Sequence, residues 1–63
     1  MDTFKAVMIA EGVYESEEDE IITAWQTLID TGLCWQLQGW FGRTASNLIE
    51  QGICHPKKVN QDK

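Results

Sequence analysis

The chain carries three segments in which apolar residues recur at the spacing of one helical face. In residues 17–31 they return every three or four positions, which places them on one stripe of a helix. This stripe consists of Ile21, Ile22, Trp25, Leu28 and Ile29. Residues 3–11 and 35–51 repeat the spacing. Their apolar or small positions are Phe4, Val7 and Met8 in the first segment and Leu37, Trp40, Phe41, Thr44, Ala45 and Leu48 in the second. The pattern predicts an all-α fold, a small domain of three helices over residues 3–11, 17–31 and 35–51.

The ends of these helices share one signal: two apolar residues, two polar or small residues, a glycine and another apolar residue. It occurs at residues 8–13, 28–33 and 48–53. Glycine takes the left-handed conformation that closes a helix without a Cβ clash, and the apolar residue after it folds back onto the last turn. The signal therefore predicts three glycine-capped ends. The sequences between the signals do not match one another, so no structural repeat is predicted.

The helix starts are marked less uniformly. Ser16 stands three residues before Asp19, a spacing that resembles a capping box, in which the serine hydroxyl accepts a backbone N–H at the start of the helix. Gly39 and Gly42 lie inside the third predicted helix, where each glycine costs about 1 kcal/mol relative to alanine. Either these glycines serve a close packing contact or the helix breaks there.

The apolar pattern fades after Cys54. Pro56 disfavours helix in the residue before it, and residues 57–63 contain a single apolar side chain. We therefore predict one helical domain over residues 1–55 and a flexible, disordered C-terminal tail over residues 56–63. A chain of 63 residues is too short for a two-domain enzyme or a nucleotide-binding α/β fold.

Charge is distributed unevenly along the chain, whose net charge is −5. Residues 1–31 hold eight acidic residues against Lys5, a balance of −7, whereas residues 32–63 hold four basic residues against two acidic ones, a balance of +2. So few cations leave little means of neutralising phosphates, which argues against direct nucleic-acid binding. No segment approaches the run of about 20 apolar residues that a membrane span needs.

The acidic residues concentrate around the start of the second predicted helix. They are Glu15, Glu17, Glu18, Asp19 and Glu20. Carboxylates are favoured at a helix N-terminus by the positive end of the helix dipole, so the main interpretation is a solvated helix start. The alternative is an acidic surface that imitates a nucleic-acid backbone and occupies the basic groove of a DNA- or RNA-binding protein.

Few residues of the chain are suited to catalysis or to metal binding. Cys34, Cys54 and His55 supply three zinc ligands, whereas a structural zinc site needs four, so we expect no metal and no other cofactor. His55 adjoins Cys54 in the sequence, a placement that seldom aligns a nucleophile with its base. We therefore expect a non-enzyme whose cysteines are reduced and buried. Residues 1–12 lack the features of a secretory signal, which predicts a cytoplasmic protein.

A dense group of large side chains occupies residues 35–43. Trp35 and Trp40 are five positions apart, about 140° around a helix, so both cannot lie at the centre of one stripe. We expect one tryptophan to join Trp25 and Phe41 in the core and the other to cover its edge or enter an interface, since tryptophan and arginine dominate interface hot spots. The candidate protein interface consists of Trp35, Gly39, Trp40, Gly42 and Arg43. Its glycines would admit another helix, either the second helix of the chain or a second copy.

Self-association is a further expectation. A core of this size rarely supplies more than about 3 to 5 kcal/mol, and small domains without disulfides or metals often gain stability by oligomerising. The acidic first half and the slightly basic second half favour antiparallel pairing of two copies. We therefore expect a homodimer.

Residues 28–45 read LIDTGLCWQLQGWFGRTA. This block resembles a family of very small, functionally uncharacterised proteins of tailed bacteriophages, including phages of marine bacteria and cyanobacteria. The likeness runs from Glu17 to Cys54, and its most specific parts are Leu-Ile-Asp-Thr-Gly and Gly-Arg-Thr-Ala. It implies a phage origin and expression in the cytoplasm of the bacterial host. It assigns no functional residue.

These observations favour a small phage accessory protein that acts by binding a host or phage protein. A domain of this size presents a standard interface more readily than an active site. An acidic inhibitor of a DNA- or RNA-binding protein is one alternative, and a virion or assembly component is another.

Overall fold

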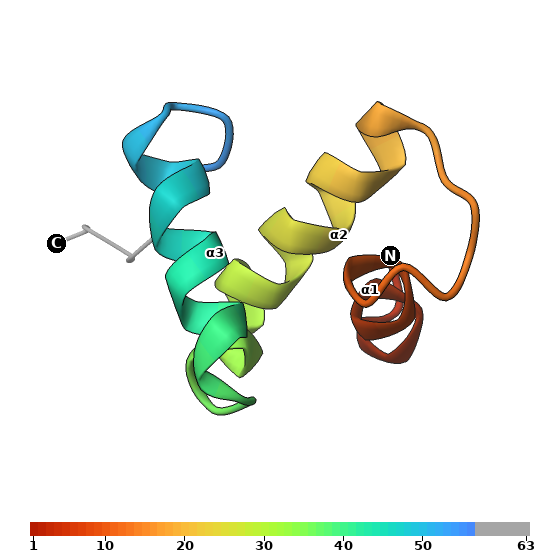
Figure 1. Ribbon diagram of the computed structural model, residues 1–63, viewed down its shortest axis with the longest axis horizontal. Helices are drawn as coiled ribbons and strands as arrows, with labels where there is room; N and C mark the ends of the chain where they lie inside the picture. Colours follow the sequence, from red (N-terminus) through yellow and green to blue (C-terminus); the bar gives the residue numbers. More distant parts are fainter. Residues whose placement is uncertain (57–63) are drawn as a thin grey trace, which may run out of the picture.

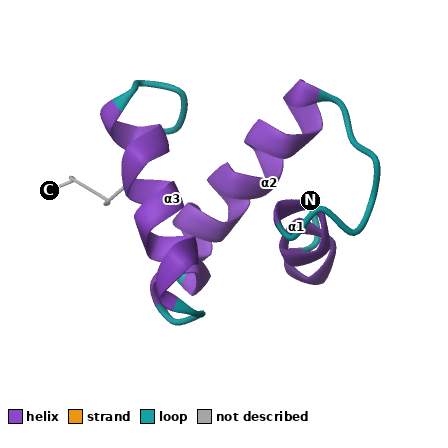
Figure 2. Ribbon diagram, viewed as in Figure 1, coloured by secondary structure: helices purple, strands orange, loops and turns teal. Residues whose placement is uncertain are grey.

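Three α-helices and one short 3₁₀ helix make up the computed structural model, which describes residues 1–56. In chain order they are α1 (Thr3–Ala10), α2 (Glu18–Thr31), η1 (Leu33–Trp35) and α3 (Gly39–Glu50). The described part contains no strand, so the predicted all-α class with three helices is confirmed (Figure 2). α2 runs through the middle of the molecule, with α1 on one side and α3 on the other (Figure 1). The predicted flexible tail lies, apart from Pro56, outside the described residues.

Left-handed glycines end the helices, as predicted. Gly12 has φ +80°; its N–H donates to Ile9 O over 3.0 Å, and the Val13 N–H donates to Met8 O over 3.0 Å. These two bonds form the Schellman motif, which satisfies carbonyls that the last helical turn leaves without partners. The end of α3 forms the same motif around Gly52, which is also left-handed. The Gly52 N–H donates to Ile49 O at 3.0 Å, and the Ile53 N–H donates to Leu48 O at 2.9 Å.

The end of α2 differs from the other two. Gly32 is left-handed at φ +78°, and its N–H reaches Ile29 O at 3.0 Å. The next N–H, that of Leu33, donates to the Thr31 hydroxyl oxygen at 3.4 Å. The chain then continues directly into η1.

The predicted capping box at Ser16 is wrong. α2 begins at Glu18, and its N-cap residue is Glu17, whose backbone is extended and whose side chain makes no capping hydrogen bond. Ser16 therefore lies one position too early to cap the helix. Acidic side chains fill the first turn of α2, where the positive end of the helix dipole favours them. α1, in contrast, has a side-chain cap, because the Asp2 carboxylate accepts the Lys5 N–H at 3.2 Å.

The third helix is shorter than the predicted span of residues 35–51. Residues 33–35 form η1, Gln38 is extended at φ −60° and ψ 155°, and α3 begins only at Gly39. The tight 3₁₀ turn and the extended residue interrupt the ladder of helical hydrogen bonds. The chain thus breaks before the first glycine: Gly39 is the first residue of α3, and Gly42 lies in the helix interior.

The core is built around α2, which supplies four of the buried residues, more than any other element. The buried side chains are Ala6, Ile9, Ala24, Trp25, Leu28, Ile29, Cys34, Phe41, Ala45 and Cys54. The predicted stripe on α2 is confirmed at Trp25, Leu28 and Ile29, whereas Ile22 is half-buried and Ile21 is exposed. Both cysteines are buried and free, as predicted.

The predicted core face of α1 is wrong at Phe4 and Met8, while Val7 packs against the core. Phe4 is exposed, and Val7 and Met8 are only half-buried, whereas Ala6 and Ile9 are buried on the side that contacts α2. Because α1 has apolar residues on two faces, their spacing does not identify the face that packs. The packing of Ala6 and Ile9 into the core cluster identifies this face as the one that joins the core.

The chain beyond α3 returns to α2. The side-chain amide of Gln26 pairs with both backbone polar groups of His55: its Nε2 donates to His55 O at 2.9 Å, and the His55 N–H donates to its Oε1 at 2.8 Å. The preceding residue, Cys54, is buried with its Sγ 3.9 Å from Ile22 O. These contacts fix the end of the described chain on the middle of α2.

Candidate functional site

One candidate tryptophan belongs to an aromatic cluster formed by α2 and α3. The Trp40 ring stacks on Phe41, with ring centroids 4.0 Å apart and planes inclined by 28°. Trp25 of α2 meets Trp40 edge-on at 6.2 Å and Phe41 at 5.8 Å. Trp25 and Phe41 are buried, while Trp40 remains 37% exposed. Trp40 thus covers the edge of the core and presents part of its ring to solvent. The prediction that one of the two candidate tryptophans joins the core is therefore wrong, because Trp35 is exposed as well.

The other candidate tryptophan belongs to η1 and packs on α3. Trp35 is 50% exposed, and its ring covers Gly42. A Cβ on Gly42 would lie 3.4 Å from Cε3 of Trp35 and 3.8 Å from the carbonyl oxygen of Cys34. The close neighbour of this glycine is therefore η1 of the same chain and not another helix. Gly42 is half-buried and serves to seat Trp35.

Gly39 and Arg43 lie on the outward face of α3, and both are exposed. The Arg43 guanidinium runs back along the first turn, since its Nη1 is 3.6 Å from the position that a Cβ on Gly39 would take. At about 100° per residue, Trp40 lies about 60° to one side of Arg43, and Gly42, which carries Trp35, lies about 100° to the other. The two tryptophans therefore flank Arg43 across the width of α3. We call Trp35, Gly39, Trp40 and Arg43 the aromatic surface.

The aromatic surface offers binding chemistry. Its tryptophans present apolar rings and indole N–H donors, and its arginine presents five N–H donors with a fixed positive charge. A guanidinium is weakly hydrated and pairs readily with carboxylates, so it loses less than an ammonium group when it is covered. This arrangement matches a partner surface that has apolar contacts on two sides of an acidic or carbonyl group.

The thiols of Cys34 and Cys54 are not arranged as nucleophiles. Burial raises the pKa of both thiols; a backbone hydrogen bond partly opposes this for Cys34, and the charge of Asp30 adds to it for Cys54. Because the thiolate is the reactive form, both side chains stay in the unreactive form near neutral pH. Within residues 1–56, no three His, Cys, Asp or Glu side chains are placed to hold a metal ion.

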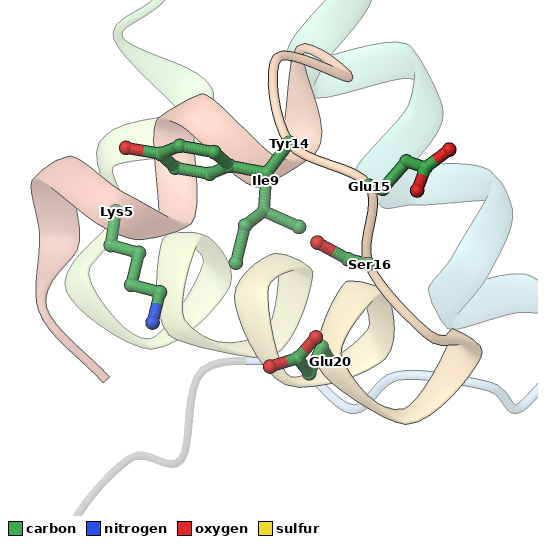
Figure 3. Close-up of a pocket in the computed structure, with 6 residues that line it drawn as sticks. All are labelled: Lys5, Ile9, Tyr14, Glu15, Ser16 and Glu20. Atoms are coloured by element: carbon green, nitrogen blue, oxygen red, sulfur yellow. The ribbon is translucent and has the colours of Figure 1, made fainter.

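The acidic candidates surround the connection from α1 to α2, and all five are exposed. α1 contributes Lys5 and α2 contributes Glu20 to an open pocket of about 460 Å³, whose lining side chains are drawn in Figure 3. Its lining is completed by Ile9, Tyr14, Glu15 and Ser16. Glu17 joins Glu15, Ser16 and Glu20 at a neighbouring hollow of about 650 Å³. The structure thus gathers Glu15, Glu17 and Glu20, while Glu18 and Asp19 line neither hollow.

The contact between Gln26 and His55 and the exposure of Phe4 were not predicted from the sequence. Gln26 and His55 are 29 residues apart, and nothing in the hydrophobic pattern relates them. The exposure of Phe4 had a signal, because α1 also offers Ala6 and Ile9 as a second, smaller apolar face.

None of the helices in residues 1–56 is long and apolar enough to cross a membrane. Comparison with curated proteins and with solved structures yields no match. A family model does match: the one described as a domain of unknown function (DUF7417) aligns with residues 2–61. The match includes every helix of the fold and both groups of candidate residues. The chain therefore belongs to the DUF7417 family.

Proposed function

We propose that this protein is a non-catalytic, phage-encoded accessory protein that acts in the cytoplasm of the bacterial host by binding another protein through the aromatic surface. The resemblance of residues 28–45 to small proteins of tailed bacteriophages supports the phage origin and the location. The partner is a host or phage protein.

The observation that carries the proposal is the exposure of two tryptophans that are held in fixed positions. Trp35 rests on Gly42, and Trp40 stacks on Phe41. A side chain that is already ordered loses little conformational entropy on binding, so more of its contact energy appears as affinity. Tryptophan and arginine are also the residue types most enriched among interface hot spots. Two anchored tryptophans on either side of Arg43 therefore form a pre-organised binding feature.

The placement of the reactive side chains supports a non-catalytic role. The thiols of Cys34 and Cys54 are buried, and burial raises their pKa values, which leaves them protonated. The five acidic candidates are exposed, where water and salt screen their charges. Active sites, in contrast, tune their acids and nucleophiles in sheltered pockets.

A second copy of the chain is one partner that we propose for the aromatic surface. Arg43 lies in the basic half of the chain, and the exposed acidic residues of α2 lie in the acidic half. Antiparallel pairing would bring Arg43 of each copy toward the acidic residues of the other. It would also cover the exposed parts of Trp35 and Trp40, a gain for a domain with so small a core.

Affinity capture with matched baits tests the proposed function. The wild-type chain, Arg43→Glu, Trp35→Ala and the control Glu50→Gln are each immobilised and exposed to a lysate of infected bacteria. Arg43 is exposed and Trp35 is half-exposed, so both substitutions leave the core in place. Glu50 is an exposed residue of α3 about two turns from Arg43. We expect the same protein on the wild-type and control baits and its loss from the other two. Equal capture by all four baits would contradict the proposal.

A second candidate function is inhibition of a DNA- or RNA-binding protein by nucleic-acid mimicry. The observation that favours it is the gathering of Glu15, Glu17 and Glu20 at open hollows beside α2. A partner held mainly by these exposed charges would dissociate as salt is raised, because screening weakens such contacts. Capture that stays constant from about 50 to about 300 mM salt would reject this candidate and favour the aromatic surface.

A further inference from the structure

Helix α1 is apolar on two faces. Ala6 and Ile9 are buried on the side of α2. On the roughly opposite side, Phe4 is 68% exposed and Met8, one turn later, is half-buried. Val13 continues this side past the end of the helix, since its N–H donates to Met8 O at 3.0 Å, and it is 56% exposed. We call Phe4, Met8 and Val13 the α1 ridge.

The apolar side chains of the α1 ridge are exposed to solvent, as is typical of a surface that another molecule covers. A helix that is apolar on all sides is normally buried on all sides. Contiguous apolar side chains on the outside of a folded domain mark sites of interaction. Phe4 leaves a larger fraction of its side chain in solvent than either tryptophan of the aromatic surface.

The α1 ridge lies in the acidic half of the chain. Glu11 directly follows the helix and lies on the same side as Phe4 at about 100° per residue. Glu15 and Glu20 line a pocket with Lys5 and Ile9, on the side of α1 that faces α2. Residues 1–31 hold eight acidic residues against one lysine. The ridge is therefore an apolar strip with Glu11 beside it, in a segment whose charge balance is −7.

We propose that the α1 ridge is a second interaction surface, which docks into an apolar groove rimmed by lysine and arginine side chains on another protein. An apolar helix face laid into a groove is a common mode of recognition. Positive charges at the rim of the groove would attract and orient the acidic surroundings of the ridge. α1 and α3 lie on opposite sides of α2 (Figure 1), so this inference is independent of the function proposed for the aromatic surface.

The same charges disfavour two other occupants of the α1 ridge. A second copy packed ridge to ridge would bring together two segments that each carry a balance of −7, and like charges repel across an interface. A cytoplasmic membrane surface is itself anionic, so it attracts basic segments and repels an acidic one.

Titration of the ¹⁵N-labelled chain with a synthetic peptide tests the inference. The probe is an amphipathic helix of leucine and lysine, which presents an apolar stripe rimmed by positive charge. We expect the NMR signals of Phe4, Met8 and Val13 to shift on binding. Phe4→Ser should weaken the affinity about tenfold or more, whereas Phe4→Leu, which keeps an apolar side chain, should retain it. Ile53→Ser, at another exposed apolar position, should bind like the wild type.

Three results would overturn the inference. Equal affinity of the wild type and Phe4→Ser for the peptide would show that charge attraction alone holds the complex and that the ridge does not take part. Ridge signals that shift when the protein is concentrated without peptide would identify a second copy as the occupant. Binding to neutral phosphatidylcholine vesicles with no response to the peptide would identify a lipid surface.

Discussion

Gln26 shows how one polar side chain positions a whole segment. Its amide makes two hydrogen bonds to the backbone of His55, at 2.9 and 2.8 Å, and its Nε2 also donates to Asp30 Oδ1 at 3.0 Å. These three bonds fix the amide in one orientation. The burial of Cys54, next to His55, therefore depends on a side chain from the middle of α2.

Replacing Gln26 with alanine should loosen the end of the described chain. Each net hydrogen bond contributes about 0.5 to 1.5 kcal/mol, so we expect the free energy of unfolding to fall by about 1 to 2 kcal/mol. The Cys54 thiol should also react faster with a thiol reagent, while the Cys34 thiol should not. Urea unfolding and the labelling rate of each cysteine measure the effect, with Gln36→Ala at an exposed position as the control. An unchanged labelling rate for Cys54 would show that Gln26 does not hold the segment.

Two glycines at the ends of α3 should respond to alanine differently. Gly52 has φ +78°, and the left-handed conformation costs a residue with a Cβ about 1 to 2 kcal/mol. Gly52→Ala should lower the free energy of unfolding by about that amount. At Gly39 a Cβ would contact only the end of the Arg43 side chain, at 3.6 Å, so Gly39→Ala should be neutral or slightly stabilising. Thermal unfolding measures the stability of both variants. An equal loss of stability in the two would contradict the claim that the left-handed conformation of Gly52 requires glycine.

The buried thiols of Cys34 and Cys54 give the stability a dependence on pH. Burial raises the pKa of both above the ordinary value of 9.0, so the unfolded chain releases these protons at lower pH than the folded chain does. The stabilisation is complete below the unfolded pKa and is lost as the pH rises through the folded pKa. We expect the free energy of unfolding to fall above about pH 9, and to fall less steeply in a Cys34→Ala, Cys54→Ala double variant. Urea unfolding at a series of pH values measures both slopes, and identical slopes would contradict the effect.

At the scale of elements, hydrophobic periodicity was sufficient to locate the helices. It identified α2 best, because that helix has a single apolar stripe and a core to pack against. It failed at α1, where two faces are apolar and only the packing on α2 selects one. Periodicity also failed at the start of α3. The break in the helix there accompanies the packing of Trp35 on Gly42, a tertiary contact that the spacing of apolar residues cannot predict.

The same break explains how much of the candidate site was predictable. Composition alone identified Trp35, Trp40 and Arg43 as candidates. In one continuous helix the two tryptophans would be about 140° apart, which left open which of them joins the core. The extended backbone at Gln38 separates η1 from α3, and only the resulting geometry places Trp40 on Phe41 and Trp35 on the other side of Arg43.

The start of α2 offers a stabilising substitution. Glu17 occupies the N-cap position without a capping hydrogen bond. Serine is preferred there and contributes about 0.5 to 2 kcal/mol relative to a residue that does not cap. We expect Glu17→Ser to raise the free energy of unfolding by about 0.5 to 1 kcal/mol, and Ser16→Ala to change it little. Thermal unfolding compares the stability of the two variants. A clear loss of stability in Ser16→Ala would show that Ser16 caps the helix after all.

At the scale of the whole molecule, α2 is the element against which the rest of the chain packs. α1 lies on one side, η1 and α3 lie on the other, and the chain after α3 returns to its middle (Figure 1). No other element of residues 1–56 covers the outer faces of α1 and α3 in this arrangement. The α1 ridge lies in the acidic half of the chain and the aromatic surface in the basic half, so the two surfaces are suited to partners of opposite charge.

Site-specific photo-crosslinking in infected cells tests the proposed use of the aromatic surface most directly. p-Benzoylphenylalanine replaces either Ser46, an exposed residue of α3 about one turn beyond Arg43, or the control Ile53, an exposed residue after the end of α3. We expect irradiation to link the Ser46 variant to one discrete protein or to a second copy of the chain, and to link the Ile53 variant to neither. The same crosslinks from both positions, or none from Ser46, would contradict binding through this surface.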